Sequence, residues 1–169
     1  MTEAPKRSKT LWYVLGCLGL SAMIVPCILV AIAVPAYQRY MRRARGMEAR
    51  ANVAMIASGV RSYCDTERAG TDGFVTHELP AAAGPTPSAP GPERQFATFG
   101  PEWASVGFAT SDPIYYSYSM TRPNATTLGV LAEGDLDGNG VRSRFESTCM
   151  LEPTGSCTCS ELQVTNELE

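Results

Sequence analysis

An acidic, glycine-containing stretch, DLDGNGVRSRFE at residues 135–146, has the composition and spacing of a calcium-binding loop. The candidate side-chain ligands stand at its first, third, fifth and twelfth places: Asp135, Asp137, Asn139 and Glu146. The backbone carbonyl of Val141 is a further candidate ligand. Oxygen donors in this order can wrap Ca²⁺, with a glycine at the sixth place for the sharp turn. The spacing therefore predicts a calcium site.

The same residues allow an interpretation without metal. Asp, Asn and Gly are also the residues of a β-turn whose side chains bond their own backbone. Arg142 stands where calcium loops favour an aliphatic residue, and the flanking segments have the composition of strands. Both interpretations stay open at this point.

Four cysteines in the acidic part of the chain predict two disulfides and an oxidising compartment: Cys64, Cys149, Cys157 and Cys159. One residue separates the last two, which is too close for them to pair with each other without strain. We therefore expect each to find a distant partner, with Cys64 tying the end of a helix to the C-terminal loop. Zinc is the alternative, but the set lacks a Cys-x-x-Cys pair and His77 is the only histidine.

Residues 11–36 form a run of 26 positions without a charged side chain. At about 1.5 Å per residue such a helix crosses a bilayer. We predict a basic cytoplasmic leader at residues 1–10 and a transmembrane segment at 11–36, in which Cys17 and Cys27 face lipid or pack. A cleaved signal peptide, ending near Ala31 and Ala33, is the alternative, but the run is long for a signal.

Charge divides sharply along the chain. Up to Cys64 there are nine Lys and Arg against two Glu, and from Asp65 onward fifteen Asp and Glu against five Arg. The acidic part would repel phosphates, so we expect no nucleic acid partner. We expect the arginines after the apolar run, at 39, 42, 43 and 45, to be solvated beside lipid headgroups. No nucleophile motif or phosphate loop is present in the sequence, so we predict a protein that is not an enzyme.

The remaining elements follow from periodicity. Apolar residues recur every three or four positions over 37–69, which predicts an amphipathic helix continuing the span. Residues 70–104 are a connection, irregular where prolines crowd 79–93, and Phe96, Phe99, Trp103 and Phe108 begin the core. Strands are predicted near 113–120, 126–133, 142–151 and 160–165, within a domain at 105–169. The fold class is α+β, with one long helix packed on a small antiparallel sheet.

Two segments of the helical half resemble bacterial type IV pilins: VAIAVPAYQRYMRRAR at 30–45 and EARANVAMI at 48–56. In that family an apolar run ending in proline is followed by a basic, aromatic helical segment. The later segments SDPIYYSY, at 111–118, and EGDLDGNG, at 133–140, resemble pilin-like proteins and pseudopilins of delta-proteobacteria. The resemblance implies a single-pass inner-membrane protein with a periplasmic C-terminal domain. It also implies polymerisation with other pilin subunits through the helix.

The sequence departs from the family at the processing site. Aligned on Pro35, the cleaved bond falls between Tyr13 and Val14, where the family has Gly and usually Phe. Leu18 stands where the family has Glu. The resemblance therefore implies a minor or degenerate subunit of a pilus, on the cell surface, or of a type II secretion fibre. The alternative is a calcium-stabilised binding module that stays tethered to the inner membrane and never polymerises.

Overall fold

The computed structural model describes residues 9–69 and 75–168. Most of the predicted leader, at 1–8, lies outside the described residues, as does part of the predicted connection, at 70–74. The chain divides into two compact units, Met1–Met41 and Arg42–Glu169, each described below by itself. Helix α1, Lys9–Asp65, supplies residues to both and runs through Pro26 and Pro35.

The first unit consists of the N-terminal part of α1. This helix is long and apolar enough to cross a membrane, and the most apolar window within it is not buried in the protein. Large apolar side chains lie on every side of the helix, without the polar face that surface helices have.

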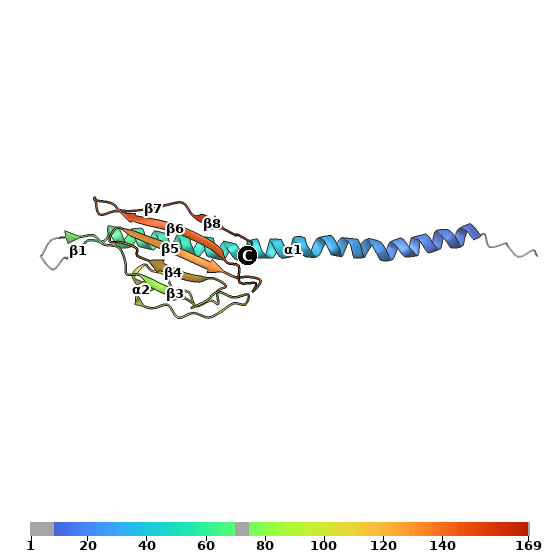
Figure 1. Ribbon diagram of the computed structural model, residues 1–169, viewed down its shortest axis with the longest axis horizontal. Coiled ribbons are helices and arrows are strands. Elements are labelled where there is room, and N and C mark those ends of the chain that lie inside the picture. Colours follow the sequence, from blue (N-terminus) through green and yellow to red (C-terminus); the bar gives the residue numbers. More distant parts are fainter. Residues whose placement is uncertain (1–8, 70–74, 169) are drawn as a thin grey trace, which may run out of the picture. The chain divides into compact units, whose positions relative to one another are not determined.

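The second unit is built on an antiparallel sheet with the strand order β3-β4-β5-β6-β7, in which β8 also pairs with β6 (Figure 1). Its strands are β3 (Ala83–Thr86), β4 (Ser117–Thr121), β5 (Thr127–Gly134), β6 (Ser143–Leu151), β7 (Cys157–Cys159) and β8 (Gln163–Thr165). A separate pair, β1 (Arg68–Ala69) and β2 (Val75–Thr76), follows α1. The predicted α+β arrangement of a long helix on a small antiparallel sheet is confirmed.

One face of the sheet and one stripe of α1 form the core. In β5 every second residue is buried, as expected of a strand with one covered face. The buried apolar side chains of α1 lie on one stripe, mostly three or four positions apart: Ala49, Val53, Ile56, Ala57, Val60 and Cys64. Burial of this stripe against the sheet is what fixes the second half of α1 in place.

A glycine lets α1 approach the loop after the short helix α2 (Pro101–Ser105). A Cβ on Gly59 would lie 1.9 Å from the carbonyl oxygen of Val106. The helix therefore needs glycine at this position, although glycine weakens an α-helix elsewhere.

Two expectations about the region before β4 are wrong. Residues 79–93 are not wholly irregular, because β3 lies among them. It occupies the edge of the sheet, where an antiparallel strand tolerates Pro85, which has no N–H to donate. Phe96 does not join the core with Phe99, Trp103 and Phe108, because its side chain is 80% exposed.

Candidate functional site

The first unit presents an uncovered apolar surface. Every large apolar side chain that the structure describes between Trp12 and Tyr40 is exposed, from 47% at Ile24 to 75% at Tyr13. Cys27 lies in this stretch as a free, exposed thiol. A helix with apolar side chains on all sides is stable in lipid or among other helices, where burial replaces contact with water. This surface is therefore the first candidate for function.

The arginines at the start of the second unit hold its parts together. Arg42 Nη1 donates to the carbonyl of Leu168 at 2.9 Å, and Arg42 Nη2 lies 3.2 Å from an Asp137 carboxylate oxygen. Arg50 pairs with Glu167 at 2.7 Å. These contacts fasten the C-terminal segment and the acidic turn to α1.

Arg45 makes a different contact, over the ring of Tyr115 at 4.6 Å from its centre. The expectation of a wholly solvated arginine cluster is therefore wrong for Arg42 and Arg45, whereas Arg39 and Arg43 are exposed. Sequence spacing carries no signal for these contacts, because their partners lie far along the chain.

The acidic turn between β5 and β6 is closed by its own side chains. Asp135 accepts hydrogen bonds from the backbone N–H groups of Gly138 and Gly140, at 2.8 and 3.1 Å. Asn139 Oδ1 accepts from the N–H of Val141 at 2.6 Å. Gly138 and Gly140 both have positive φ, of 74° and 86°. This is the geometry of Asx turns.

The full calcium ligand set does not come together in this structure. Glu146 lies in β6, where its backbone pairs with Leu131 and Gln163, and Asp137 faces Arg42. Within residues 9–69 and 75–168, no group of three or more His, Cys, Asp or Glu side chains is placed to hold a metal ion. The described residues therefore hold no preformed cluster of these ligands, and calcium binding stays a prediction.

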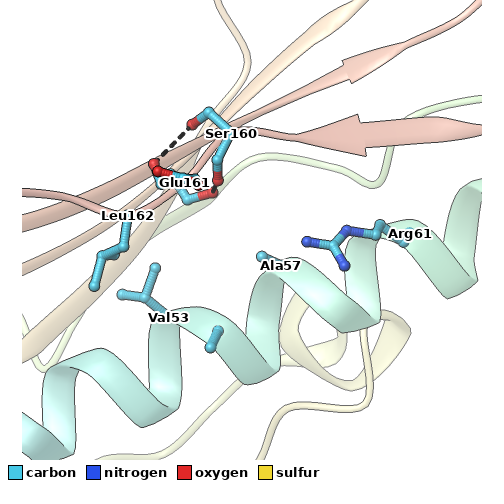
Figure 2. Close-up of a pocket in the computed structure, with 8 residues that line it drawn as sticks. Val53, Ala57, Arg61, Ser160, Glu161 and Leu162 are labelled. Carbon is cyan, nitrogen blue, oxygen red and sulfur yellow. Dashed lines mark hydrogen bonds between the residues drawn. The ribbon is translucent and has the colours of Figure 1, made fainter.

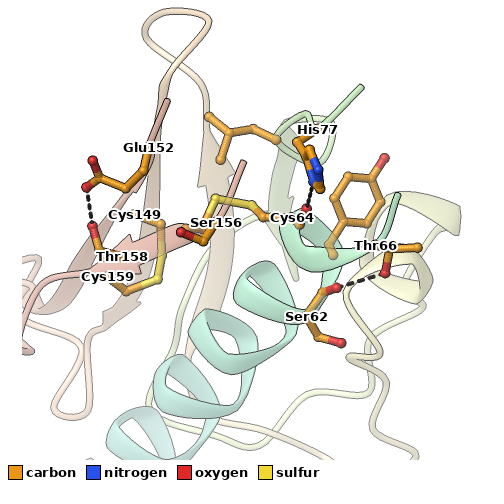
Figure 3. Close-up of a disulfide and its surroundings, with 12 residues drawn as sticks. Ser62, Cys64, Thr66, His77, Cys149, Glu152, Ser156, Thr158 and Cys159 are labelled. Carbon is orange, nitrogen blue, oxygen red and sulfur yellow. Dashed lines mark hydrogen bonds between the residues drawn. A yellow bond between two sulfur atoms is a disulfide. The ribbon is translucent and has the colours of Figure 1, made fainter. Parts of the chain in front are cut away.

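Two disulfides join the end of α1 to the last strands, and the prediction of two disulfides is confirmed. Cys64 pairs with Cys157, across 93 residues of chain, and Cys149 pairs with Cys159 on the neighbouring strand. Figure 3 shows His77 beside the Cys64 end of α1, where its Nδ1 lies 2.8 Å from the Cys64 carbonyl oxygen. The final turn of the helix is thus covalently fixed to β7.

A partly buried carboxyl group, Glu48, faces the sheet from α1. Its Oε1 accepts hydrogen bonds from the backbone N–H of Tyr115 at 3.0 Å and from the hydroxyl of Tyr118 at 3.3 Å. Asn52 Nδ2 donates to the same hydroxyl at 2.8 Å. Burial raises the pKa of Glu48 above its ordinary value, and the hydrogen bonds from Tyr115 and Tyr116 oppose that rise. Burial, together with the negative charge of Glu48, also raises the pKa of Tyr118.

A hollow of about 310 Å³ opens between α1 and the segment that joins β7 to β8 (Figure 2). Apolar side chains form much of its lining, including Val53, Ala57 and Leu162. Figure 2 shows Val53 and Leu162 facing each other, and Arg61 reaching toward the space beneath Ser160 and Glu161. The sequence does not reveal the hollow, because it forms where small residues of α1 lie opposite the segment between β7 and β8, far along the chain.

Comparison with known proteins gives no relative. No family model, no curated protein and no solved structure matches this chain.

Proposed function

We propose that this chain is a membrane-anchored structural subunit of the type IV pilin kind, a minor or degenerate component of a pilus or of a type II secretion fibre. The observation that carries the proposal is the contrast within α1. One part of the helix leaves its apolar side chains exposed, and the other part is built into a disulfide-linked sheet domain. Such a helix can exchange lipid for neighbouring helices with little loss of burial.

The disulfides support an oxidising location for the sheet domain. Structural disulfides persist in the periplasm and on cell surfaces and are rare in the cytoplasm. Together with the apolar helix, the disulfides support the proposal of an inner-membrane anchor with the sheet domain in the periplasm. The working surface in this proposal is the exposed helix, and its role is structural rather than catalytic.

The processing site favours a second candidate, a tethered binding module that never polymerises. Tyr13, Val14 and Leu18 stand where pilins have the residues for cleavage and subunit docking. In pilins the glutamate lies within the membrane and is thought to pair with the amino terminus that cleavage creates on a neighbouring subunit. A chain that keeps its leader lacks that amino terminus, and with Leu18 it also lacks the acid. Either charge alone would lie unpaired within the membrane, which is costly, so loss of the cleavage site and loss of the glutamate are consistent with each other.

Mass spectrometry of the mature protein separates the two candidates. Cells are sheared, and the chain is purified from the extracellular fraction and from membranes. A subunit is expected in the sheared fraction, with an amino terminus at residues 13–20 if the leader is cut. Full-length protein confined to the membrane fraction contradicts the subunit proposal and favours the tethered module.

A further inference from the structure

Phe96 is an aromatic side chain held outward by rigid backbone. The N–H of Gln95 donates to the carbonyl of Ile114 at 2.8 Å, and the N–H of Ile114 donates back at 2.9 Å. Successive side chains of extended backbone point to opposite sides, so the fixed Gln95 turns Phe96 toward solvent. Among the described large apolar side chains of the second unit, Phe96 at 80% is the most exposed.

The hollow beside β8 stays open because the side chains on its helix wall are small and hydrogen bonds fix its other wall. On the helix side, Ala54 and Ala57 are too small to fill it. On the other side, Ser147 Oγ donates to the Ser160 carbonyl at 3.0 Å, and the Ser160 N–H donates to the Thr148 carbonyl at 2.8 Å. These bonds fix the segment between β7 and β8. A site that is already formed binds without the cost of ordering a loop.

The size and lining of the hollow suit one aromatic ring. A dry apolar cavity of about 150 Å³ is enough to bind benzene, and this hollow has about 310 Å³. Its rim carries one charge of each sign, Arg61 and Glu161. Neither forms an ion pair within the described part of the chain.

The segment before Phe96 carries the complementary pair of charges. Glu93 and Arg94 precede it and are both exposed, and Arg94 also lies 5.1 Å from the centre of the Tyr115 ring. When Phe96 enters the hollow, Glu93 and Arg94 come to a rim that carries one basic and one acidic side chain, so each charge can meet its opposite. Aromatic anchors with charged neighbours at the rim are typical of protein interfaces.

We propose that Phe96 of one copy of this chain inserts into the hollow of a second copy. Phe96 belongs to the β4 side of the sheet, through the Gln95–Ile114 bridge, and the hollow belongs to the β6–β8 side. A contact between two different surfaces of the same protein is heterologous and leaves one surface free at each end, so further copies can add by the same contact. The inference rests on the proposed role as an assembling subunit and names a contact for its domain.

The test places the photo-crosslinking residue p-benzoylphenylalanine at position 96 of the full-length chain, expressed in its own membrane. Light is expected to give a dimer whose cross-linked peptide contains residues 53–61 or 160–162. The same probe at Met150, a half-exposed β6 residue away from the hollow, is the positional control and is expected to give no such adduct.

Filling the hollow sharpens the test. Ala54 is exposed on the hollow's wall, so Ala54→Trp occupies the space without disturbing the core. It is expected to lower the yield of the position-96 dimer at least about tenfold, whereas Ala54→Ser leaves the yield unchanged. Adducts only with lipid or with another protein, adducts that map elsewhere on a second copy, or a yield insensitive to Ala54→Trp each overturn the inference.

The outcomes also separate this inference from the proposed function. Chain present in the sheared fraction without an adduct in the hollow leaves the subunit proposal standing and overturns the Phe96 contact. If the chain is confined to membranes but still gives an adduct in the hollow, the result supports the Phe96 contact and contradicts the proposal of a fibre subunit. Absence of both the sheared chain and the adduct contradicts both.

Discussion

The two parts of α1 are one helix in two different environments. Up to Tyr40 the described large apolar side chains are all exposed, whereas from Ala49 to Cys64 a single stripe is fully covered by the sheet. The difference lies in arrangement: apolar residues surround the helix in the first part and recur every three or four positions in the second. The sheet covers the apolar stripe of the second part, whereas the apolar side chains of the first part stay uncovered in the described residues.

The largest effect is expected from the covalent fastening of the second part. C64A/C157A removes a disulfide that closes 93 residues, and C149A/C159A removes one that closes 10. Loop-closure entropy predicts losses in the free energy of unfolding of about 4–5 and 2–3 kcal/mol respectively. Thermal unfolding of both variants of the full chain in detergent measures the difference. Equal losses would show that loop entropy is not the main contribution.

A charge placed on each part tests what surrounds it. Ile28 and Met55 are equally exposed, at 53% and 52%, so their side chains differ in environment and not in burial within the protein. Ile28→Arg is expected to oppose membrane insertion by about 2.5–3.5 kcal/mol, the cost of arginine at the centre of a spanning helix. Met55→Arg costs little. Membrane fractionation of both variants measures this, and equal partitioning would contradict a membrane role for the first part.

Glycines give a second matched pair. Gly59→Ala is expected to lower the free energy of unfolding by about 1–3 kcal/mol, because the new Cβ meets the Val106 carbonyl and overpacking outweighs the gain in helix propensity. A Cβ on Gly16 would have no neighbouring atom within 4 Å, so Gly16→Ala leaves domain stability unchanged. Urea unfolding measures both. A stabilising Gly59→Ala would mean that α1 shifts easily on the sheet.

Glu48 is expected to make the free energy of unfolding depend on pH, because packing of this part of α1 on the sheet buries its carboxyl group. Below the ordinary carboxyl pKa the group is protonated in both states. As the pH rises past that value the unfolded chain loses its proton first, because the folded pKa is raised, so stability falls over the window up to the raised pKa. Glu48→Gln keeps an accepting oxygen and is expected to flatten this fall. Melting temperatures between about pH 4 and 8 measure it, with Glu161→Gln as control.

The smallest effect is expected at the acidic turn. Asp137→Asn removes a partly exposed ion pair with Arg42, which is worth about 0–1 kcal/mol. Because hydrogen bonds from backbone N–H groups to the side chains of the turn close it, and Glu146 lies in β6, a chelator is expected to leave the melting temperature unchanged. A rise in melting temperature on adding Ca²⁺ would support the calcium prediction.

Local pattern is enough to predict α1 and the three central strands. The apolar run, the stripe recurring every three or four positions after it, and the tyrosine-rich segment before Met120 are all signals within one stretch of chain. The disulfide partner of Cys64 is also predicted to lie in the C-terminal loop, because the short spacing of Cys157 and Cys159 excludes their pairing with each other.

The rest depends on contacts between distant segments. β3 forms because β4 offers it an open edge, and proline composition hides that possibility. Local pattern predicts that Arg42 faces solvent, but its partners lie 95 and 126 positions further along the chain, beyond any local pattern. The outward direction of Phe96 is likewise set by the bridge at Gln95 and not by its own apolar character.

The Cys64–Cys157 bond has a mechanical consequence. Tension applied along α1 toward the sheet domain reaches the last turn of the helix, where a covalent link passes it directly into β7. That end of the helix cannot be peeled from the sheet without breaking a sulfur–sulfur bond. At the Arg42 end the helix is held by noncovalent contacts, among them the hydrogen bond to Leu168 and the ion pair with Asp137. A pulled domain would therefore open from there, reversibly, while the disulfide kept helix and sheet together.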